Sequence, residues 1–152
     1  MCAINAGASE WDDLLPDAPA RGLLFCAAGV FSANRYVAYA AWEGEEKDVV
    51  NLAVRQVSWD GVENYRRFAT DGLRDFERVM RVLVENGAWE LGDAVPVYDL
   101  GGPPLDLPTY HVTIAEGQRR NSFAVFDPLA LSDSSYLTVV QTLQEYFSDL
   151  GL

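Results

Sequence analysis

A single imidazole limits the nucleophilic chemistry open to this sequence. His111 is the only histidine, and Cys26 is the cysteine with which it would form a thiol–imidazole pair. A serine or cysteine nucleophile needs such a base within hydrogen-bond reach, and a third group must orient that base. Cys26 lies in an apolar run, which predicts a buried, structural thiol. His111 shares the Thr109 and Thr113 side of a strand, which we expect to face solvent. We therefore predict that the protein is not an enzyme.

Pairs of carboxylates are the second arrangement that could carry acid–base chemistry. Asp99 and Asp106 flank a Gly-Gly-Pro-Pro turn, and Asp127 and Asp133 flank a later loop. With 23 Asp and Glu residues in the chain, such pairs arise by chance. Asp in turns and caps also commonly accepts hydrogen bonds from local backbone N–H groups. A small enzyme or ligand-binding protein that uses carboxylates in a cleft is kept as an alternative hypothesis.

The sequence contains no spacing typical of a metal or phosphate site. One histidine and two separated cysteines do not supply the four ligands of a zinc site. The acidic turn at residues 43–48 is too short for a calcium loop. The glycine pair Gly101-Gly102 is followed by two prolines, which lack the N–H donors that a phosphate cradle requires. We predict no metal and no cofactor.

The charge of the chain excludes several classes of partner. There are 11 Lys and Arg residues against 23 Asp and Glu residues, which gives a formal net charge of −12. Nucleic acids and anionic membranes attract basic surfaces, so we predict neither as a partner. No apolar run approaches the roughly 20 residues that cross a bilayer. An acidic surface suits another, basic protein, or serves solubility alone.

Length and composition are those of a folded domain. A chain of 152 residues with 49% hydrophobic residues buries a sizeable core without metals or disulfides. Two cysteines do not form a disulfide framework, so we expect a cytoplasmic protein. If Cys2 were a mature N-terminus, the protein would instead be lipid-anchored or exported. Residues 1–8 are small and unpatterned, and we expect them to be disordered.

Hydrophobic periodicity predicts the elements that hold these residues. Strand patterns cover 22–31, 35–42, 49–57, 63–69, 109–114 and a segment around 123–126, and helical spacing follows at 72–86 and 133–150. Both sides of 35–42 are apolar, which indicates a central strand. We predict one α+β domain over 1–152, with a mainly antiparallel sheet of about six strands and two principal helices on one face.

Two stretches share the order strand, turn, strand, helix. They span 49–86 and 109–150, and Val54, Tyr65 and Phe68 of the first align with similar residues of the second. Each unit also carries an arginine pair, at 66–67 and at 119–120. This ββα pseudo-repeat fits either an internal duplication or the common pattern of any hairpin followed by a helix.

The irregular stretch 92–108 joins the two units. Long irregular loops in compact domains are often functional, and this one contains four prolines and several apolar residues. We expect it either to pack onto the domain or to contact a partner. Together with the acidic turn, it provides the candidate partner-binding residues. These are Glu43, Glu45, Glu46, Tyr98, Asp99, Leu100, Leu105 and Asp106.

These observations favour a non-enzymatic acidic protein-binding module of the inhibitor, immunity or adaptor type, acting through protein–protein contact. Its partner would be another protein with a basic surface. The alternatives are the carboxylate-based enzyme or ligand-binding protein, and a structural homo-oligomeric subunit that associates through an exposed sheet edge.

Overall fold

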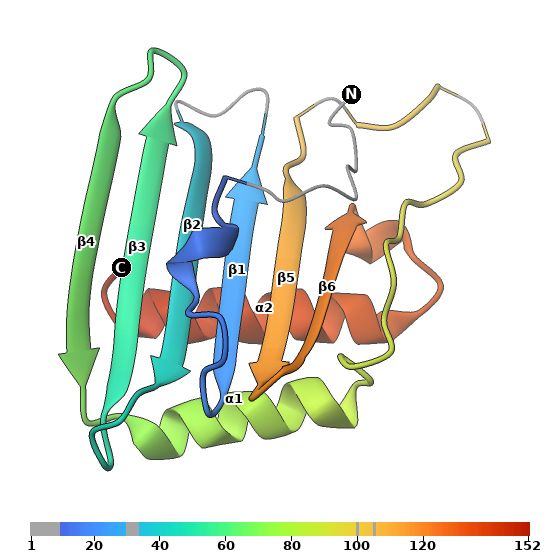
Figure 1. The fold of residues 1–152 in the computed structure, drawn as a ribbon. Helices are drawn as coiled ribbons and strands as arrows, with labels where there is room; N and C mark the ends of the chain where they lie inside the picture. The colour runs from blue at the N-terminus through green and yellow to red at the C-terminus, as the bar shows by residue number, and fades with distance from the viewer. Residues whose placement is uncertain (1–9, 30–33, 100, 105) are drawn as a thin grey trace.

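The fold is a six-stranded antiparallel sheet with two helices on one face (Figure 1). The computed structural model describes residues 10–29, 34–99, 101–104 and 106–152. The sheet order is β4-β3-β2-β1-β5-β6, and every neighbouring pair is antiparallel. The strands are β1 (Gly22–Ala28), β2 (Asn34–Glu43), β3 (Val50–Ser58), β4 (Glu63–Thr70), β5 (Thr109–Glu116) and β6 (Arg119–Phe126). The helices are α1 (Leu73–Glu85) and α2 (Ser134–Asp149), with short 3-10 helices η1 (Asp12–Leu14) and η2 (Pro128–Ala130). The predicted α+β class is confirmed.

Some predictions concern residues outside the described part of the chain. The disorder expected for residues 1–8 belongs to this group, as do the last residues of the strand expected over 22–31. Leu100 and Leu105, two of the candidate binding residues, also lie outside the described residues.

The main core lies between the sheet and the two helices. On α1 the side chains of Phe76, Val79, Met80 and Leu83 are buried, which is the spacing that one face of a helix gives. On α2 the buried side chains include Val139, Val140, Leu143 and Phe147. They pack against one side of β1, β2, β3, β5 and β6, and the Phe147 ring stacks on Tyr39 of β2 with centroids 5.0 Å apart. The helices predicted from the spacing at 72–86 and 133–150 are therefore confirmed.

A smaller core lies on the opposite face of the sheet. Leu14 and Leu15, at the end of η1, pack there with Leu24, Cys26 and other buried residues. In Figure 1 the segment containing η1 crosses in front of β1 and β2. Because β2 is covered on both sides, its residues are apolar on both faces, and the prediction of a central strand is confirmed.

The two ββα units occupy opposite ends of the sheet. β3, β4 and α1 come from the first unit, and β5, β6 and α2 from the second, on either side of the β1–β2 hairpin. This placement does not confirm an internal duplication, because a hairpin followed by a helix is a common arrangement. The units also differ in burial: β4 is exposed along almost its whole length, whereas β6 is buried at Phe123–Val125.

The two edge strands, β6 and β4, differ in whether other residues of the chain bond to their outer side. Ala94 lies beside β6, where its N–H donates to Ala124 O over 2.9 Å and its carbonyl accepts from Phe126 N over 3.0 Å. The Asp93 carboxylate accepts from Ala124 N over 2.7 Å. The chain thus covers part of the β6 edge with its own residues. On the β4 edge, no described residue forms an equivalent bridge.

Candidate functional site

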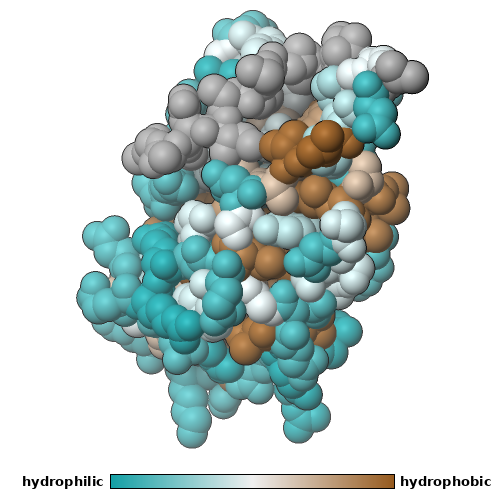
Figure 2. Space-filling view, turned by 90° about the vertical axis from the view of Figure 1, so that its right-hand side faces the viewer, coloured by the Kyte–Doolittle hydropathy of each residue, from teal (hydrophilic) through white to brown (hydrophobic). Residues whose placement is uncertain are grey.

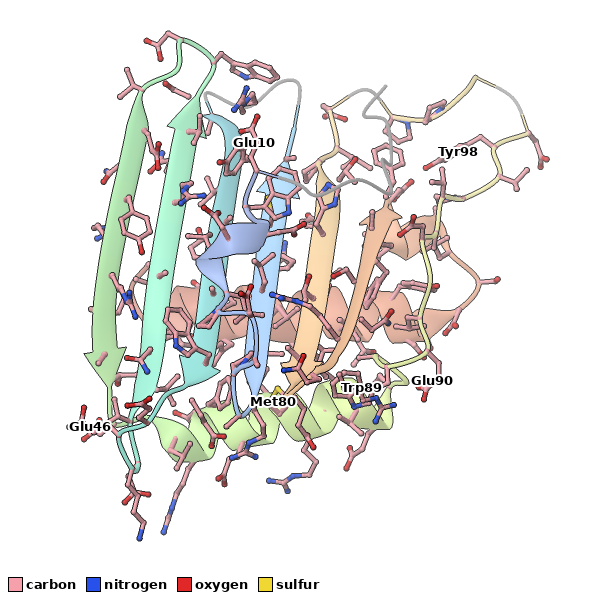
Figure 3. All side chains as sticks on the ribbon, in the orientation of Figure 1. Glu10, Glu46, Met80, Trp89, Glu90 and Tyr98 are labelled. Carbon is pink, nitrogen blue, oxygen red and sulfur yellow. The ribbon has the colours of Figure 1, made fainter. Side chains whose placement is uncertain are left out.

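The candidate residues form two separate groups. In Figure 3 Glu46 lies at the lower left, beyond the ends of β2 and β3, and Tyr98 lies at the upper right, beyond β6. The acidic turn and the loop at 92–108 are therefore at opposite corners of the molecule. A partner of ordinary interface size, about 800 Å² on each side, does not contact both corners without wrapping around the sheet.

Within the acidic turn, the three glutamates differ in their surroundings. Arg21 Nε donates to Glu43 Oε2 over 2.8 Å, and an Arg21 terminal nitrogen also contacts Glu43 Oε1. The same guanidinium reaches Glu77 Oε1 on α1 over 3.0 Å, and these carboxylates raise the pKa of Arg21. Glu43 thus fastens the end of β2 to α1, whereas Glu45 and Glu46 are exposed.

In the loop, the Tyr98 side chain is hydrogen-bonded to Asp127, the residue that follows β6. Its hydroxyl donates to Asp127 Oδ2 over 2.6 Å. Burial and this hydrogen bond raise the pKa of Tyr98 to about 12, so it is a protonated donor at neutral pH. Asp99 and Asp106 are exposed.

The second carboxylate pair has structural roles at chain turns. Asp127 precedes η2 with φ 49°, a left-handed conformation that Asp adopts more readily than most residues. Asp133 caps α2 by accepting a hydrogen bond from Ser135 N over 2.9 Å. The Asp133 carboxylate is therefore a local helix cap, as expected for Asp in turns and caps, whereas the side-chain partner of Asp127 is Tyr98, which is distant in sequence.

A small cavity opens beside the loop, between β5, η2 and α2. Its volume is about 160 Å³. Six of its lining residues are apolar, namely Leu107, Pro108, Pro128, Leu129, Leu137 and Val140. The polar members are Tyr110, Asp127, Gln141 and Gln144. Gln144 Nε2 donates to the Tyr110 hydroxyl over 3.2 Å at its side. The lining comes from three separate stretches of chain, so periodicity within any one of them gave no signal of a cavity.

Exposed apolar side chains occur both in the lining of this cavity and in the loop that precedes it. We define the loop face as Val95, Val97, Leu107 and Leu129 together with the cavity beside them. Val97 is 94% exposed and Leu129 is 79% exposed, far more than large apolar side chains in the core. Figure 2 shows this side of the molecule, where hydrophobic residues gather in the upper half among hydrophilic ones. The apolar residues of 92–108 therefore differ in exposure. Pro96 is buried, whereas its two valine neighbours are exposed.

The charge around the loop face has one sign. Between residues 82 and 152 the sequence has only two basic residues, Arg119 and Arg120, at the β5–β6 turn. Acidic residues on or next to the loop face are Asp93, Asp99, Asp106, Asp127 and Asp133. An apolar surface inside an acidic field attracts basic groups and repels acidic ones.

The thiol and the imidazole come together, but not as a catalytic pair. Cys26 and His111 are directly opposite each other on β1 and β5. Burial raises the pKa of the Cys26 thiol and lowers the pKa of His111, so both are neutral at neutral pH. A thiol held in its protonated form is a poor nucleophile. The expectation that His111 faces solvent was wrong: its ring is half-buried beneath Trp11, with centroids 4.7 Å apart.

The buried setting of His111 predicts a pH-dependent stability. Its pKa lies below 6.5 in the folded protein because burial disfavours the imidazolium, which outweighs the opposing charges of Asp12 and Asp93. The unfolded chain therefore binds a proton first as the pH falls below about 6.5, and the free energy of unfolding decreases. Between about pH 7.5 and pH 5.5, we expect urea unfolding to show a larger loss for the wild type than for His111→Gln. Equal losses would contradict this assignment.

A polar pocket lies on the same face of the sheet as η1. It has a volume of about 400 Å³ and contains two arginines and three acidic residues. Arg55 donates to Asp13 Oδ1 over 2.7 Å, lies 3.1 Å from Glu63 Oε1 and donates to the Glu10 carbonyl over 3.0 Å. Arg35 pairs with the Glu10 carboxylate. Each cation is already engaged, so these contacts fasten the segment around η1 to β2 and β3.

Across the described ranges, no three His, Cys, Asp or Glu side chains are grouped closely enough to hold a metal ion. No helix in these ranges is long and apolar enough to cross a membrane. Comparison with models of known protein families and with curated proteins found no match to this chain.

Proposed function

We propose that this protein is a non-enzymatic binding module that contacts a basic protein partner through its loop face. The observation that carries the proposal is the exposure of Leu129 at a mainly apolar cavity, together with the exposure of Val97 in the loop whose Tyr98 bonds to Asp127 of the cavity lining. Scattered apolar residues are ordinary on protein surfaces, but a cluster of them beside a cavity is typical of an interaction site.

The cavity has the size of a single anchoring side chain. An apolar cavity of about 150 Å³ admits a group as large as benzene, and this one measures about 160 Å³. An aromatic or branched aliphatic side chain of the partner would fill it and would bury the surrounding leucine and valine surface. Asp127 and Gln144 at its margin would accept hydrogen bonds from a polar tip of that side chain.

The acidic surroundings favour a partner with a basic surface. Five acidic residues and no basic residue lie in 92–108 and 127–133, so a partner with Lys or Arg around its anchor would associate faster and more selectively. Because exposed charges are screened by salt, we expect its association rate to fall as ionic strength rises. The acidic turn at 43–48 would at most add long-range attraction, given its distance from the loop face.

The test is capture of a partner by variants of the immobilised protein. Val97→Asp/Leu129→Asp places charges in the apolar contact, and we expect retention of the partner to fall at least about tenfold, the equivalent of 1.4 kcal/mol. The matched control is Val84→Asp/Gln118→Asp, which adds the same charge at exposed positions on α1 and the β5–β6 turn.

The outcomes separate the two candidate regions. A protein held in stoichiometric amount by the wild type and the control, but released by the loop-face variant, supports the proposal. Equal retention by all three rejects the loop face. If Glu45→Gln/Glu46→Gln reduces retention as strongly as the loop-face variant does, the acidic turn contributes to the contact and the assignment to the loop face alone fails.

A further inference from the structure

The open edge of the sheet at β4 is the second surface without a partner within the described chain. All residues from Glu63 to Ala69 are exposed, including Tyr65 and Phe68. At the other edge, Asp93 and Ala94 bond to β6. Exposed edge strands of this length pair readily with another chain, and proteins usually cover or shorten them. This edge lies across the sheet from the loop face, so what it binds is independent of the proposed function (Figure 1).

The hairpin fixes which backbone groups of β4 point outward. Ser58 N donates to Val62 O over 2.9 Å, so Val62 is hydrogen-bonded across the hairpin. In an antiparallel ladder such pairs alternate with pairs that share no hydrogen bond. Asn64, Arg66 and Phe68 therefore bond inward to β3. The N–H and C=O groups of Glu63, Tyr65 and Arg67 point to the free edge.

We propose that β4 pairs with β4 of a second copy of this chain, antiparallel, with the two-fold axis at Tyr65. In this register Tyr65 lies opposite Tyr65 of the second copy. Glu63 then lies opposite Arg67 of the second copy, and Val62 opposite Phe68. The backbone N–H and C=O groups of these opposite residues all point to the free edge of their own sheet. Three such pairs form with two hydrogen bonds each, so about six inter-strand backbone hydrogen bonds join the two copies.

The charges on β4 favour this register over those whose two-fold axis lies at Arg66 or Arg67. An axis at Arg66 places two Arg66 side chains opposite each other, and an axis at Arg67 does the same for Arg67. Like charges directly opposite across a strand pair are destabilising, whereas opposite charges and aromatic pairs are stabilising. The axis at Tyr65 gives two Glu63–Arg67 pairs and an aromatic pair. In the described structure neither Arg66 nor Arg67 forms an ion pair. Glu63 already lies 3.1 Å from Arg55 Nε, so its carboxylate would be shared between Arg55 and Arg67 of the second copy.

The side chains at this edge are already arranged for such a contact. Arg67 lies over the Trp42 ring at 5.2 Å and Arg55 lies over the Tyr65 ring at 5.6 Å, which holds both β4 residues against the sheet. Tyr65 and Arg67 are on the face of the sheet opposite the helices, while Val62 and Phe68 are on the helical face. In Figure 1 α1 lies near the end of β4, away from the β3–β4 turn.

The first test is the mass of the protein in solution. At physiological ionic strength, where charges beyond about 8 Å are screened, we expect light scattering over a concentration series to rise from 16.8 kDa to twice that mass. Arg67→Glu and Glu63→Arg each place like charges opposite each other and should weaken dimerisation at least about tenfold. The double variant Glu63→Arg/Arg67→Glu restores opposite charges and should regain the dimer. Arg120→Glu, at an exposed position on β6, is the matched control and should dimerise like the wild type.

The second test locates the two-fold axis. Hydrogen-bonded residues opposite each other have Cα atoms about 5.5 Å apart, within the range that a disulfide spans. In a Cys2→Ser background, Tyr65→Cys should form a covalent dimer under mild oxidation, whereas Asn64→Cys should form much less.

Three results would overturn the proposal. A single mass of 16.8 kDa at all concentrations excludes the dimer. A dimer that Arg67→Glu leaves intact, or that the double variant does not restore, excludes this register. Cross-linking of Asn64→Cys as efficient as that of Tyr65→Cys also excludes it. Circular dichroism of each variant confirms that loss of the dimer is not loss of folding.

Discussion

Replacing Phe76 with alanine should destabilise the protein by about 3–5 kcal/mol. Phe76 is fully buried on α1, in the core between the helices and the sheet. The substitution removes an aromatic ring from water-free packing and leaves a cavity that the surrounding strands cannot close. Urea unfolding followed by circular dichroism measures the loss, and a melting temperature lower by on the order of 10 °C should accompany it.

Val84→Ala is the control for this prediction. Val84 lies on the same helix but is exposed, and alanine has the higher helix propensity, so we expect a change within about 0.5 kcal/mol. If Phe76→Ala costs less than about 1 kcal/mol, then α1 does not pack on the sheet as described, and the position of the segment that follows it is also wrong.

Replacing Asn121 with alanine should cost about 2–3 kcal/mol. The Asn121 side-chain amide on β6 donates to the carbonyls of Ala88 and Leu91, over 2.7 and 3.0 Å. Both acceptors belong to the turns after α1, which lead into the loop face. Without the amide, two partly buried carbonyls lose their donor, and the tie between β6 and these turns is broken.

Asn121→Asp tests the same bonds with almost no change in shape. A carboxylate accepts hydrogen bonds but does not donate them, so at neutral pH it faces the two carbonyls with a repulsive charge. We expect its cost to be at least that of the alanine variant by urea unfolding. Gln118→Ala, exposed on the same hairpin, should be within about 0.5 kcal/mol of the wild type. A neutral Asn121→Asp would show that the amide does not hold the turns in place.

Both predictions bear on the loop face, because its position depends on elements far from it in sequence. The turns at Ala88 and Leu91 reach Asn121 because α1 packs on the sheet. Ala94, which follows these turns, bonds to β6. The hydroxyl of Tyr136 on α2 also donates to the Gly92 carbonyl over 2.8 Å. The irregular stretch is thus fastened at its start by several side chains, while Val97 beyond them is exposed.

The strands, the helices and their buried faces could be predicted from residue order because local patterns encode them. The spacing of Phe76, Val79 and Leu83 in α1 reports which side of the helix is apolar, and burial follows from that. Alternation in β5 located the strand but not its exposed side, because Thr109 and Thr113, expected to face solvent, are buried. Asp in turns and caps was expected to accept hydrogen bonds from local backbone, and Asp133 does so at the start of α2. The apolar content of both faces of β2 also identified it as central, because only a strand covered on both sides is apolar on both.

The candidate site was predicted only in part. Tyr98 was singled out for its place in an irregular apolar loop, but its partner Asp127 is distant in sequence and no spacing rule joins them. The cavity depends on Leu107, Leu129 and Val140, which belong to three different elements. His111 was expected on an open face because its neighbours on that side are threonines; the segment carrying Trp11 folds over it.

By itself, the sequence determined the fold class, the faces of the helices and the sign of the charge, since each depends on composition or on contacts within one element. Only the tertiary structure decided which strands lie at the edges, because the order β4-β3-β2-β1-β5-β6 depends on pairing between distant segments. That order leaves β4 open and places the loop at 92–108 beside β6 and α2. The two surfaces through which we expect this protein to bind others therefore arise from long-range packing, which local patterns in the chain do not record.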